Sequence, residues 1–239
     1  MPHRIAVVSD VHGNLVALDS VLADLERVAP DLVVHGGDLV GTGPRPAEVV
    51  DRVRELGWPG VAGNWERVAA GDPPDPAARS MVMAPLLQRH TSWTVERLGQ
   101  ERATWLAELP LEWRDGDRVA LVHAVPGNPW PIVRREASDG DLQTAFGGLD
   151  AAVAVYGHIH VPFVRCLDAL TVANAGSVSE PFDGDPRASY LLLEDGVPSV
   201  RRVAFDVERA VADVHAAGMP DADWAAAVYR TATLAPPPP

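Results

Sequence analysis

The sequence predicts a single α/β domain, and three observations support this prediction. Short apolar runs at 4–9 and 31–38 each end at an aspartate, and a stretch with helical spacing separates them. A second amphipathic stretch, 46–57, precedes a third apolar run at 60–63. From residue 111 onward most segments have the short, β-branched composition of strands. The β-α-β-α-β order at the start predicts parallel strands covered by helices.

Helical spacing predicts the first two helices. The first is indicated by apolar residues at Leu15, Leu18, Val21, Leu22 and Leu25. The second, 46–57, ends at Gly57, a residue typical of a helix C-cap. The prolines of 71–76 predict a loop, and a long helical region that contains Trp93 and Trp105 follows it.

The second half of the chain predicts mainly strands, at 111–114, 118–124, 150–158, 162–167, 170–176, 188–194 and 199–205. The EDG sequence at 194–196 predicts a hairpin turn between the last two. A final helical region, 206–231, leads into a proline-rich tail at 232–239, which we expect to be frayed. Because no repeat or linker is visible, we predict one domain over 1–231.

Charge and composition narrow the classes of function. The chain has 239 residues and a net charge of −13 at pH 7, with an isoelectric point near 4.9. A nucleic-acid groove is therefore not expected, because such surfaces need clustered positive charge. All 20 basic residues are arginine, which excludes Schiff-base and other lysine chemistry.

The sequence also predicts the compartment. The single cysteine, Cys166, cannot form an internal disulfide and is expected to be a core thiol. The N-terminal residues lack the pattern of a signal peptide, and no apolar run approaches the ~20 residues that cross a bilayer. We therefore expect a cytoplasmic protein without membrane contact, which could form a homo-oligomer.

Polar residues that can bind metals follow the ends of several predicted strands. They are Asp10, His12, Asp38, Asn64, His123, His158 and His160. In open α/β sheets, ligands bind beyond the carboxyl ends of the strands, so these side chains are expected to meet at one edge. An isolated Asp-x-His, Gly-Asp or Gly-Asn is an ordinary turn sequence. The whole set, in this order and with each member closing a strand, favours a metal site.

The ligand types indicate which metals the site would hold. Two carboxylates, one amide and four imidazoles without a thiolate suit Mn²⁺, Fe or Zn²⁺ rather than a structural cysteine–zinc site. Seven ligands are too many for one tetrahedral ion, but they suit two ions that share a carboxylate.

This series of motifs, D-x-H, G-D, G-N, H and G-H-x-H, resembles the calcineurin-like metallophosphoesterase superfamily. The segments 37–51, 121–126, 156–164 and 174–190 resemble its small bacterial branch of YfcE-like phosphodiesterases and diadenosine-tetraphosphatase-like proteins. The helical insert 71–105 and the C-terminus are only weakly similar. The resemblance implies a four-layer α-β-β-α sandwich of two mixed β-sheets.

The resemblance also implies which residues bind each metal. One ion would be held by Asp10, His12, Asp38 and His160. The other would be held by Asp38, Asn64, His123 and His158, with Asp38 bridging the two. A hydroxide between the ions would be the nucleophile. Mn²⁺ is the expected metal, with Fe, Zn²⁺ and Ni²⁺ as alternatives.

One residue departs from the family pattern. Trp65 stands where many relatives carry a histidine that assists the leaving group, and an indole cannot transfer a proton near neutral pH. The general acid is therefore unassigned, with His90 as a substitute if the helical insert folds over the site. Trp65 could stack on an aromatic group of the substrate or could only pack. His35 is expected to be a hydrogen-bonded core residue.

The remaining expectations concern substrate and function. Gly13, Asn14 and Ser177 are candidate substrate contacts beside Trp65. We predict a metal-dependent phosphoesterase that acts on a small or nucleotide-like phosphodiester rather than on a monoester. The alternative is a catalytically weak or inactive scaffold of the same fold that acts as a binding protein. Usable side chains at all seven ligand positions favour the enzyme.

Overall fold

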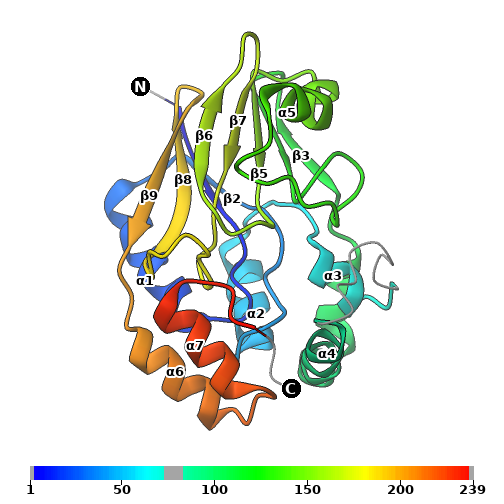
Figure 1. Cartoon of the computed structure of the whole chain (residues 1–239), viewed down its shortest axis with the longest axis vertical. Helices are drawn as coiled ribbons and strands as arrows, with labels where there is room; N and C mark the ends of the chain where they lie inside the picture. The colour runs from blue at the N-terminus through cyan, green and yellow to red at the C-terminus, as the bar shows by residue number, and fades with distance from the viewer. Residues whose placement is uncertain (1–2, 73–82, 237–239) are drawn as a thin grey trace.

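Two mixed β-sheets form the centre of the molecule in the computed structural model, which describes residues 3–72 and 83–236 (Figure 1). The first sheet has the order β2 (Leu32–His35), β1 (Arg4–Val8), β8 (Ala188–Glu194), β9 (Val197–Val203). The second has the order β3 (Glu112–Asp115), β4 (Val119–Val122), β5 (Val153–Tyr156), β7 (Thr171–Asn174), β6 (Phe163–Cys166). As predicted, β1 pairs in parallel with β2. In the second sheet, β5 also pairs in parallel with β4 and β7.

Alternation along the strands explains why the sheets pack together. In β1, Ile5 and Val7 belong to a buried cluster that also contains Leu121 and Val155 of the second sheet. Their neighbours Ala6 and Val8 face the helices instead. Because successive strand residues point to opposite faces, an almost continuous apolar strand such as β1 must be covered on both sides.

Helices cover the outer faces of both sheets. Helices α1 (Leu15–Val28) and α2 (Pro46–Leu56) share a core with the first sheet. Helix α5 (Asp139–Phe146), with the short 3₁₀ helix η1 (Gly147–Leu149), packs on the second sheet. The predicted four-layer α-β-β-α order is therefore confirmed.

A further group of helices lies at the lower end in Figure 1. It contains α4 (Ala84–Ala107), α6 (Val207–Ala216) and α7 (Ala222–Thr231), which share a buried cluster that includes Trp93 and Trp224. Within α4, Gly99 has a φ of 70° and interrupts the helical backbone. The helical region predicted at 206–231 consists of two separate helices, α6 and α7.

One predicted strand is absent from the structure, and one helix was not predicted. The predicted third strand at 60–63 makes only a single bridge, from Gly60 to His35, and helix α3 (Asn64–Ala69) begins directly after it. Helix α5 was not predicted, because its sequence is short and rich in aspartate and glycine. Its signal is a capping box, in which the Ser138 hydroxyl accepts from the Asp141 amide at 3.2 Å while the Asp141 carboxylate faces Ser138.

The C-cap at Gly57 and the hairpin turn between β8 and β9 are confirmed. Cys166 is exposed rather than buried, because it lies at the end of the edge strand β6, on the same face as the exposed Val164. Most of the predicted loop 71–76 and the last three residues lie outside the described residues. None of the helices in the part of the chain that the structure describes has the length and apolar composition needed to cross a bilayer.

Candidate metal centre

Two loops that follow adjacent parallel strands form the base of the site. The loop after β1 carries Asp10 and His12, and the loop after β2 carries Asp38. Backbone hydrogen bonds join the loops, from the Asp10 amide to the Gly37 carbonyl at 3.0 Å and from the His12 amide to the Asp38 carbonyl at 2.9 Å. The parallel pairing of β1 with β2 therefore brings both carboxylates to one edge.

The backbone at the predicted ligands adopts an unusual conformation. Five of the seven have positive φ: Asp10 (56°), His12 (47°), Asp38 (50°), His158 (66°) and His160 (56°). Residues other than glycine adopt this left-handed region rarely, and each instance is strained. Such a concentration of strain at one site is typical of side chains that the fold must aim at a ligand.

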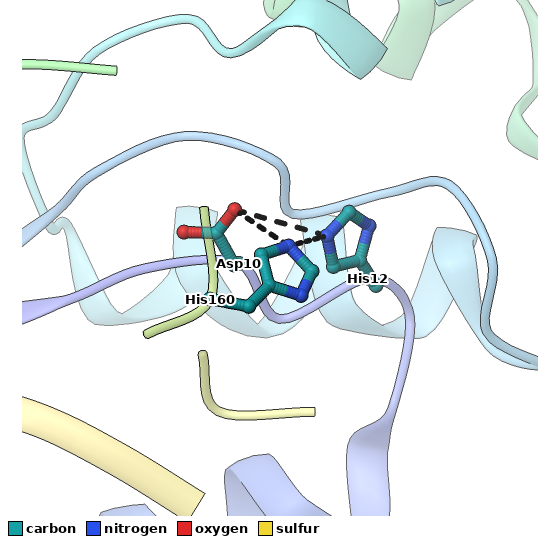
Figure 2. Close-up of side chains that lie close together, drawn as sticks. All are labelled: Asp10, His12 and His160. Atoms are coloured by element: carbon teal, nitrogen blue, oxygen red, sulfur yellow. Dashed lines mark hydrogen bonds and ion pairs between the residues drawn. The ribbon is translucent and has the colours of Figure 1, made fainter. Parts of the chain in front are cut away.

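The first cluster is formed by Asp10, His12 and His160, whose side chains point toward one another in Figure 2. The Nε2 atom of His160 lies 3.1 Å from Asp10 Oδ1 and 3.1 Å from the Nε2 atom of His12. All three residues are buried. One atom from each lies within 4.8 Å of the others, which is close enough for one cation to contact all three.

The second cluster is formed by Asp38, His123 and His158. The Nε2 atom of His123 lies 3.4 Å from Asp38 Oδ2 and 3.1 Å from the side-chain oxygen of Asn64. Asn64 is the first residue of α3, so the start of that helix delivers its amide to this cluster.

Asp38 connects the two clusters. Its Oδ2 atom lies 3.4 Å from His123 Nε2 in the second cluster and 3.8 Å from His12 Nε2 in the first. The other oxygen, Oδ1, accepts a hydrogen bond from the Trp65 amide at 2.9 Å. The structure thus brings all seven predicted ligand residues into one site.

A backbone carbonyl orients each of the four imidazoles. The Nδ1 atoms of His12, His123 and His160 lie 3.2, 2.8 and 2.7 Å from the carbonyls of Val40, Gly36 and Glu180. For His158 it is Nε2 that lies 3.0 Å from the Trp130 carbonyl. In the neutral imidazole, which is the form that binds a metal ion, the nitrogen that faces a carbonyl carries the proton, and the lone pair is on the other nitrogen. The donor set therefore fits metal ions.

Burial and neighbouring charges shift the pKa values in the site. Burial alone would raise the pKa of Asp10, but the adjacent His160 and the more distant His123 and His12 lower it well below its usual range. Burial lowers the pKa of His123, yet Asp38 outweighs this and raises it to about 10. Burial lowers the pKa of His158 to about 4. The carboxylates stay ionised and attract positive charge into a buried site.

Glu66 supports the site, although sequence reasoning did not select it. Its buried carboxylate accepts hydrogen bonds from the amides of Asp38 at 2.7 Å, Leu39 at 2.8 Å and Gly63 at 2.7 Å. It therefore joins the Asp38 loop to the turn that presents Asn64. Burial and the nearby Asp38 raise the Glu66 pKa to about 7. The available signal was its position three residues after the helix cap Gly63.

The position of Trp65 favours packing over substrate stacking. Its side chain is only 8% exposed and belongs to the core shared by α1, α2 and the first sheet. The indole meets the His12 ring edge-on, with 6.4 Å between ring centroids. Trp65 therefore packs against the proposed metal ligand His12 and exposes little surface that a substrate could contact.

The other predicted substrate contacts also have internal partners. The buried Ser177 hydroxyl donates to the Asp10 carbonyl at 2.8 Å. The Asn14 side-chain oxygen caps α1 by accepting from the Ala17 amide at 3.0 Å. Gly13 has a φ of 70° and lies against Gly43, where a Cβ atom would be 3.0 Å from the Gly43 oxygen. Each group shapes the loops, so substrate contact at these residues remains a prediction that their surroundings do not favour.

Two further histidines are core residues. His90 is fully buried, 3.4 Å from Asp221 and edge-on to Trp224, so its neighbours belong to the C-terminal segment. This position does not support a role as general acid. His35 is also fully buried, but neither ring nitrogen has a hydrogen-bond partner among residues 3–72 and 83–236. The expected hydrogen bond is therefore absent there, and burial lowers the His35 pKa to about 4.

Comparisons with known proteins agree with this geometry. The calcineurin-like phosphoesterase superfamily domain matches residues 3–195. An uncharacterized protein of Methanocaldococcus jannaschii, MJ0912, is 30% identical over 228 residues, which cover 86% of this chain and 89% of that protein. Phosphodiesterase YfcE of Escherichia coli is 25% identical over 219 residues, covering 88% and 97% of the two chains. A solved metallophosphoesterase from Sphaerobacter thermophilus aligns with a TM-score of 0.79 and 31% identity, over 98% of this chain and all of that one.

Proposed function

Since this chain belongs to the calcineurin-like phosphoesterase superfamily, we propose that it is a hydrolase with two divalent metal ions that cleaves phosphodiesters. The proposed ligands are Asp10, His12, Asp38 and His160 for one ion and Asp38, Asn64, His123 and His158 for the other. Mn²⁺ is the proposed metal. The substrate class is a small or nucleotide-like phosphodiester.

The position of Asp38 is the observation that carries this proposal. One of its oxygens, Oδ2, lies within 3.8 Å of His12 Nε2 and 3.4 Å of His123 Nε2, which belong to different clusters. A carboxylate oxygen in this position can contact two cations at once. Pairs of metal ions about 3.5–4 Å apart are common in enzymes that cleave phosphate esters.

The residues of this chain would bind the two ions and orient the phosphate ester between them. When bound, two divalent ions activate water at neutral pH and neutralise charge on the phosphate. The four imidazoles that contact backbone carbonyls would present their other ring nitrogens to the ions, and Glu66 holds the Asp38 loop against the Asn64 turn. The strained backbone at the ligands pre-sets this geometry, so it need not be reorganised during the reaction.

Leaving-group chemistry favours activated diesters. The side chain beside Asn64 is an indole, which cannot transfer its N–H proton near neutral pH, and His90 is buried against the C-terminal segment. Without a general acid, esters with good leaving groups should react much faster than alkyl esters. The relative named phosphodiesterase YfcE supports the choice of diesters over monoesters.

The proposal can be tested on purified full-length protein. The protein is stripped with a chelator and reconstituted with Mn²⁺, and metal content is measured by mass spectrometry. Hydrolysis of bis(p-nitrophenyl) phosphate and of p-nitrophenyl phosphate is then compared. We expect two ions per chain, faster hydrolysis of the diester, and loss of nearly all activity in Asp38→Asn.

Three results would count against the proposal. Metal binding without turnover of either ester would favour the alternative of a binding scaffold. Faster hydrolysis of the monoester would reverse the proposed substrate class. An active Asp38→Asn protein with full metal content would remove the bridging role from Asp38.

A further inference from the structure

We propose that Glu180 is a positioning residue that ties together the two histidines of the first cluster, through a hydrogen bond to Thr42, and so sets the affinity of one metal position only. This inference rests on the proposed two-ion site. It concerns a contact behind the ligands rather than the ligands themselves.

The first half of the connection runs from Glu180 to His160. The Glu180 carbonyl accepts a hydrogen bond from His160 Nδ1 at 2.7 Å, which fixes the tautomer that leaves Nε2 free. Two residues later, the Phe182 amide donates to the His160 carbonyl at 3.0 Å. The Phe182 ring also stacks on the imidazole, with 4.5 Å between centroids and 20° between planes. The segment 180–182 therefore holds both the backbone and the ring of His160.

The second half runs from Thr42 to His12. The His12 Nδ1 atom faces the Val40 carbonyl at 3.2 Å, two residues before Thr42. Between them, Gly41 lies directly on the imidazole, because a Cβ atom there would be 2.7 Å from His12 Nδ1. Thr94 of α4 donates to the Gly41 carbonyl at 2.8 Å and fixes the loop from the other side. Any shift of the segment 40–42 would therefore move His12.

A single side-chain hydrogen bond joins the two halves. The Thr42 hydroxyl donates to Glu180 Oε1 at 2.6 Å, and the two residues are only 4% and 2% exposed. A short bond to a buried carboxylate is among the stronger neutral-to-charged contacts, and its loss leaves that carboxylate with an unmet acceptor. Groups that orient metal-bound histidines typically change metal affinity about 10–100-fold when they are removed.

The connection should act on one cluster alone. The carbonyls that orient His123 and His158 come from Gly36 and Trp130, which lie outside the segments 40–42 and 180–182. Asp38 is held by Glu66 from α3. The second cluster therefore has its own supports, and weakening the Thr42–Glu180 bond should leave it largely unchanged.

The test measures metal binding rather than turnover. Chelator-stripped full-length protein is titrated with Mn²⁺ by calorimetry, and bound Mn²⁺ is followed by electron paramagnetic resonance. The variants are Thr42→Val, which keeps the shape and removes the donor, and Thr42→Ser, which keeps the donor. We expect Thr42→Val to weaken one of two binding steps by about 10-fold or more and to spare the other. Thr42→Ser should restore both steps, which a loss of packing alone would not explain.

Tyr190→Phe is the matched control. It also removes a buried hydroxyl that donates to a carboxylate, in this case Asp24 at 2.8 Å, but this pair does not contact a histidine of the site. It should leave both Mn²⁺ steps as in the wild type. Equal affinities in Thr42→Val and wild type, or equal weakening of both steps, would overturn the inference. Wild-type protein that binds fewer than two ions would instead contradict the proposed function.

Discussion

Close backbone contacts hold the side chains of the proposed metal ligands in place. The loop segment 40–42 lies against His12 because Gly41 has a φ of 135° and no side chain. At this position a Cβ atom would meet both the imidazole and the Trp65 indole, at 2.7 and 2.8 Å. Glycine is thus required by contact with the site as well as by its conformation.

Gly41→Ala should therefore disturb the first cluster. The added methyl group would displace His12 or Trp65, so we expect weaker binding of one Mn²⁺ ion and a fall in diester hydrolysis of about 10-fold or more. Calorimetric titration and steady-state rates measure the two effects. Gly57→Ala is the control, because Gly57 also has positive φ (65°) but a Cβ atom there meets nothing within 4 Å. If Gly57→Ala weakened Mn²⁺ binding equally, contact with His12 would not be the cause.

Trp65→His should change the dependence of rate on the leaving group. Trp65 is buried, but its ring centroid lies 6.4 Å from that of His12, and the smaller imidazole of Trp65→His would leave space beside it for a departing alkoxide. Protonation of that alkoxide is general acid catalysis, which typically contributes ~10²–10⁴-fold. We expect alkyl phosphodiesters to gain more than activated aryl diesters, measured as the ratio of their kcat values. Trp65→Phe keeps an aromatic ring without a transferable proton, and should show no selective gain. Equal behaviour of the two variants would exclude proton donation at this position.

At the scale of elements, the first turn of α3 joins the Asp38 loop to the turn that carries Asn64, both of which contribute proposed metal ligands. The helix begins at Asn64, and Glu66 is its third residue. The Glu66 carboxylate accepts hydrogen bonds from three backbone amides that are not paired within a β-sheet. The short apolar run before it can therefore end without becoming a strand. The turn presents Asn64 to His123 as a consequence of this capping.

Glu66→Ala should destabilise the protein even without metal. The change leaves three buried amides without an acceptor, and we expect the free energy of unfolding to fall by about 2–4 kcal/mol. Urea denaturation of chelator-treated protein measures it. Glu26→Ala, at an exposed position of α1, should change the free energy by less than ~0.5 kcal/mol. A loss at Glu66 no larger than this would show that the capping interaction is not structurally important.

At the scale of the whole molecule, His35 should make the free energy of unfolding depend on pH. This residue at the end of β2 is fully buried, and burial lowers its pKa from 6.5 to about 4. Below pH 6.5 the His35 side chain therefore binds a proton in the unfolded chain but stays neutral in the folded protein. The free energy of unfolding is therefore unaffected by this proton above pH 6.5. It falls by about 3 kcal/mol in total as the pH falls from 6.5 toward 4.

His35→Leu should flatten this part of the pH dependence, whatever its effect on absolute stability. Chemical denaturation between pH 4 and pH 8 measures the difference between variant and wild type. Val33→Leu, on the same strand, changes packing without a titrating group and should leave the slope unchanged. An unchanged slope in His35→Leu would show that His35 does not stay neutral in the folded protein.

Much of this protein was predictable from local sequence. The buried strands, the helices α1 and α2 and the β8–β9 hairpin follow from periodicity and turn chemistry, which act over a few residues. The seven proposed ligand residues could be selected from the sequence because each follows a predicted strand and has a side chain suited to metals. Helix α5 was not predicted, because a short polar helix has a weak periodic signal. The strand predicted at 60–63 is absent, because a short apolar extended segment cannot be distinguished from a strand by periodicity.

Only the tertiary structure decided how these residues act together. The orientation of each imidazole depends on a carbonyl distant in sequence, such as Glu180 for His160 and Val40 for His12. The burial of Trp65, the role of Glu66 and the bond between Thr42 and Glu180 likewise depend on packing between separate loops. The sequence by itself determined which ligands are present and where strands end, because these are local properties. Distances, tautomers and supports are long-range properties, and they exist only after the two sheets and their loops have packed.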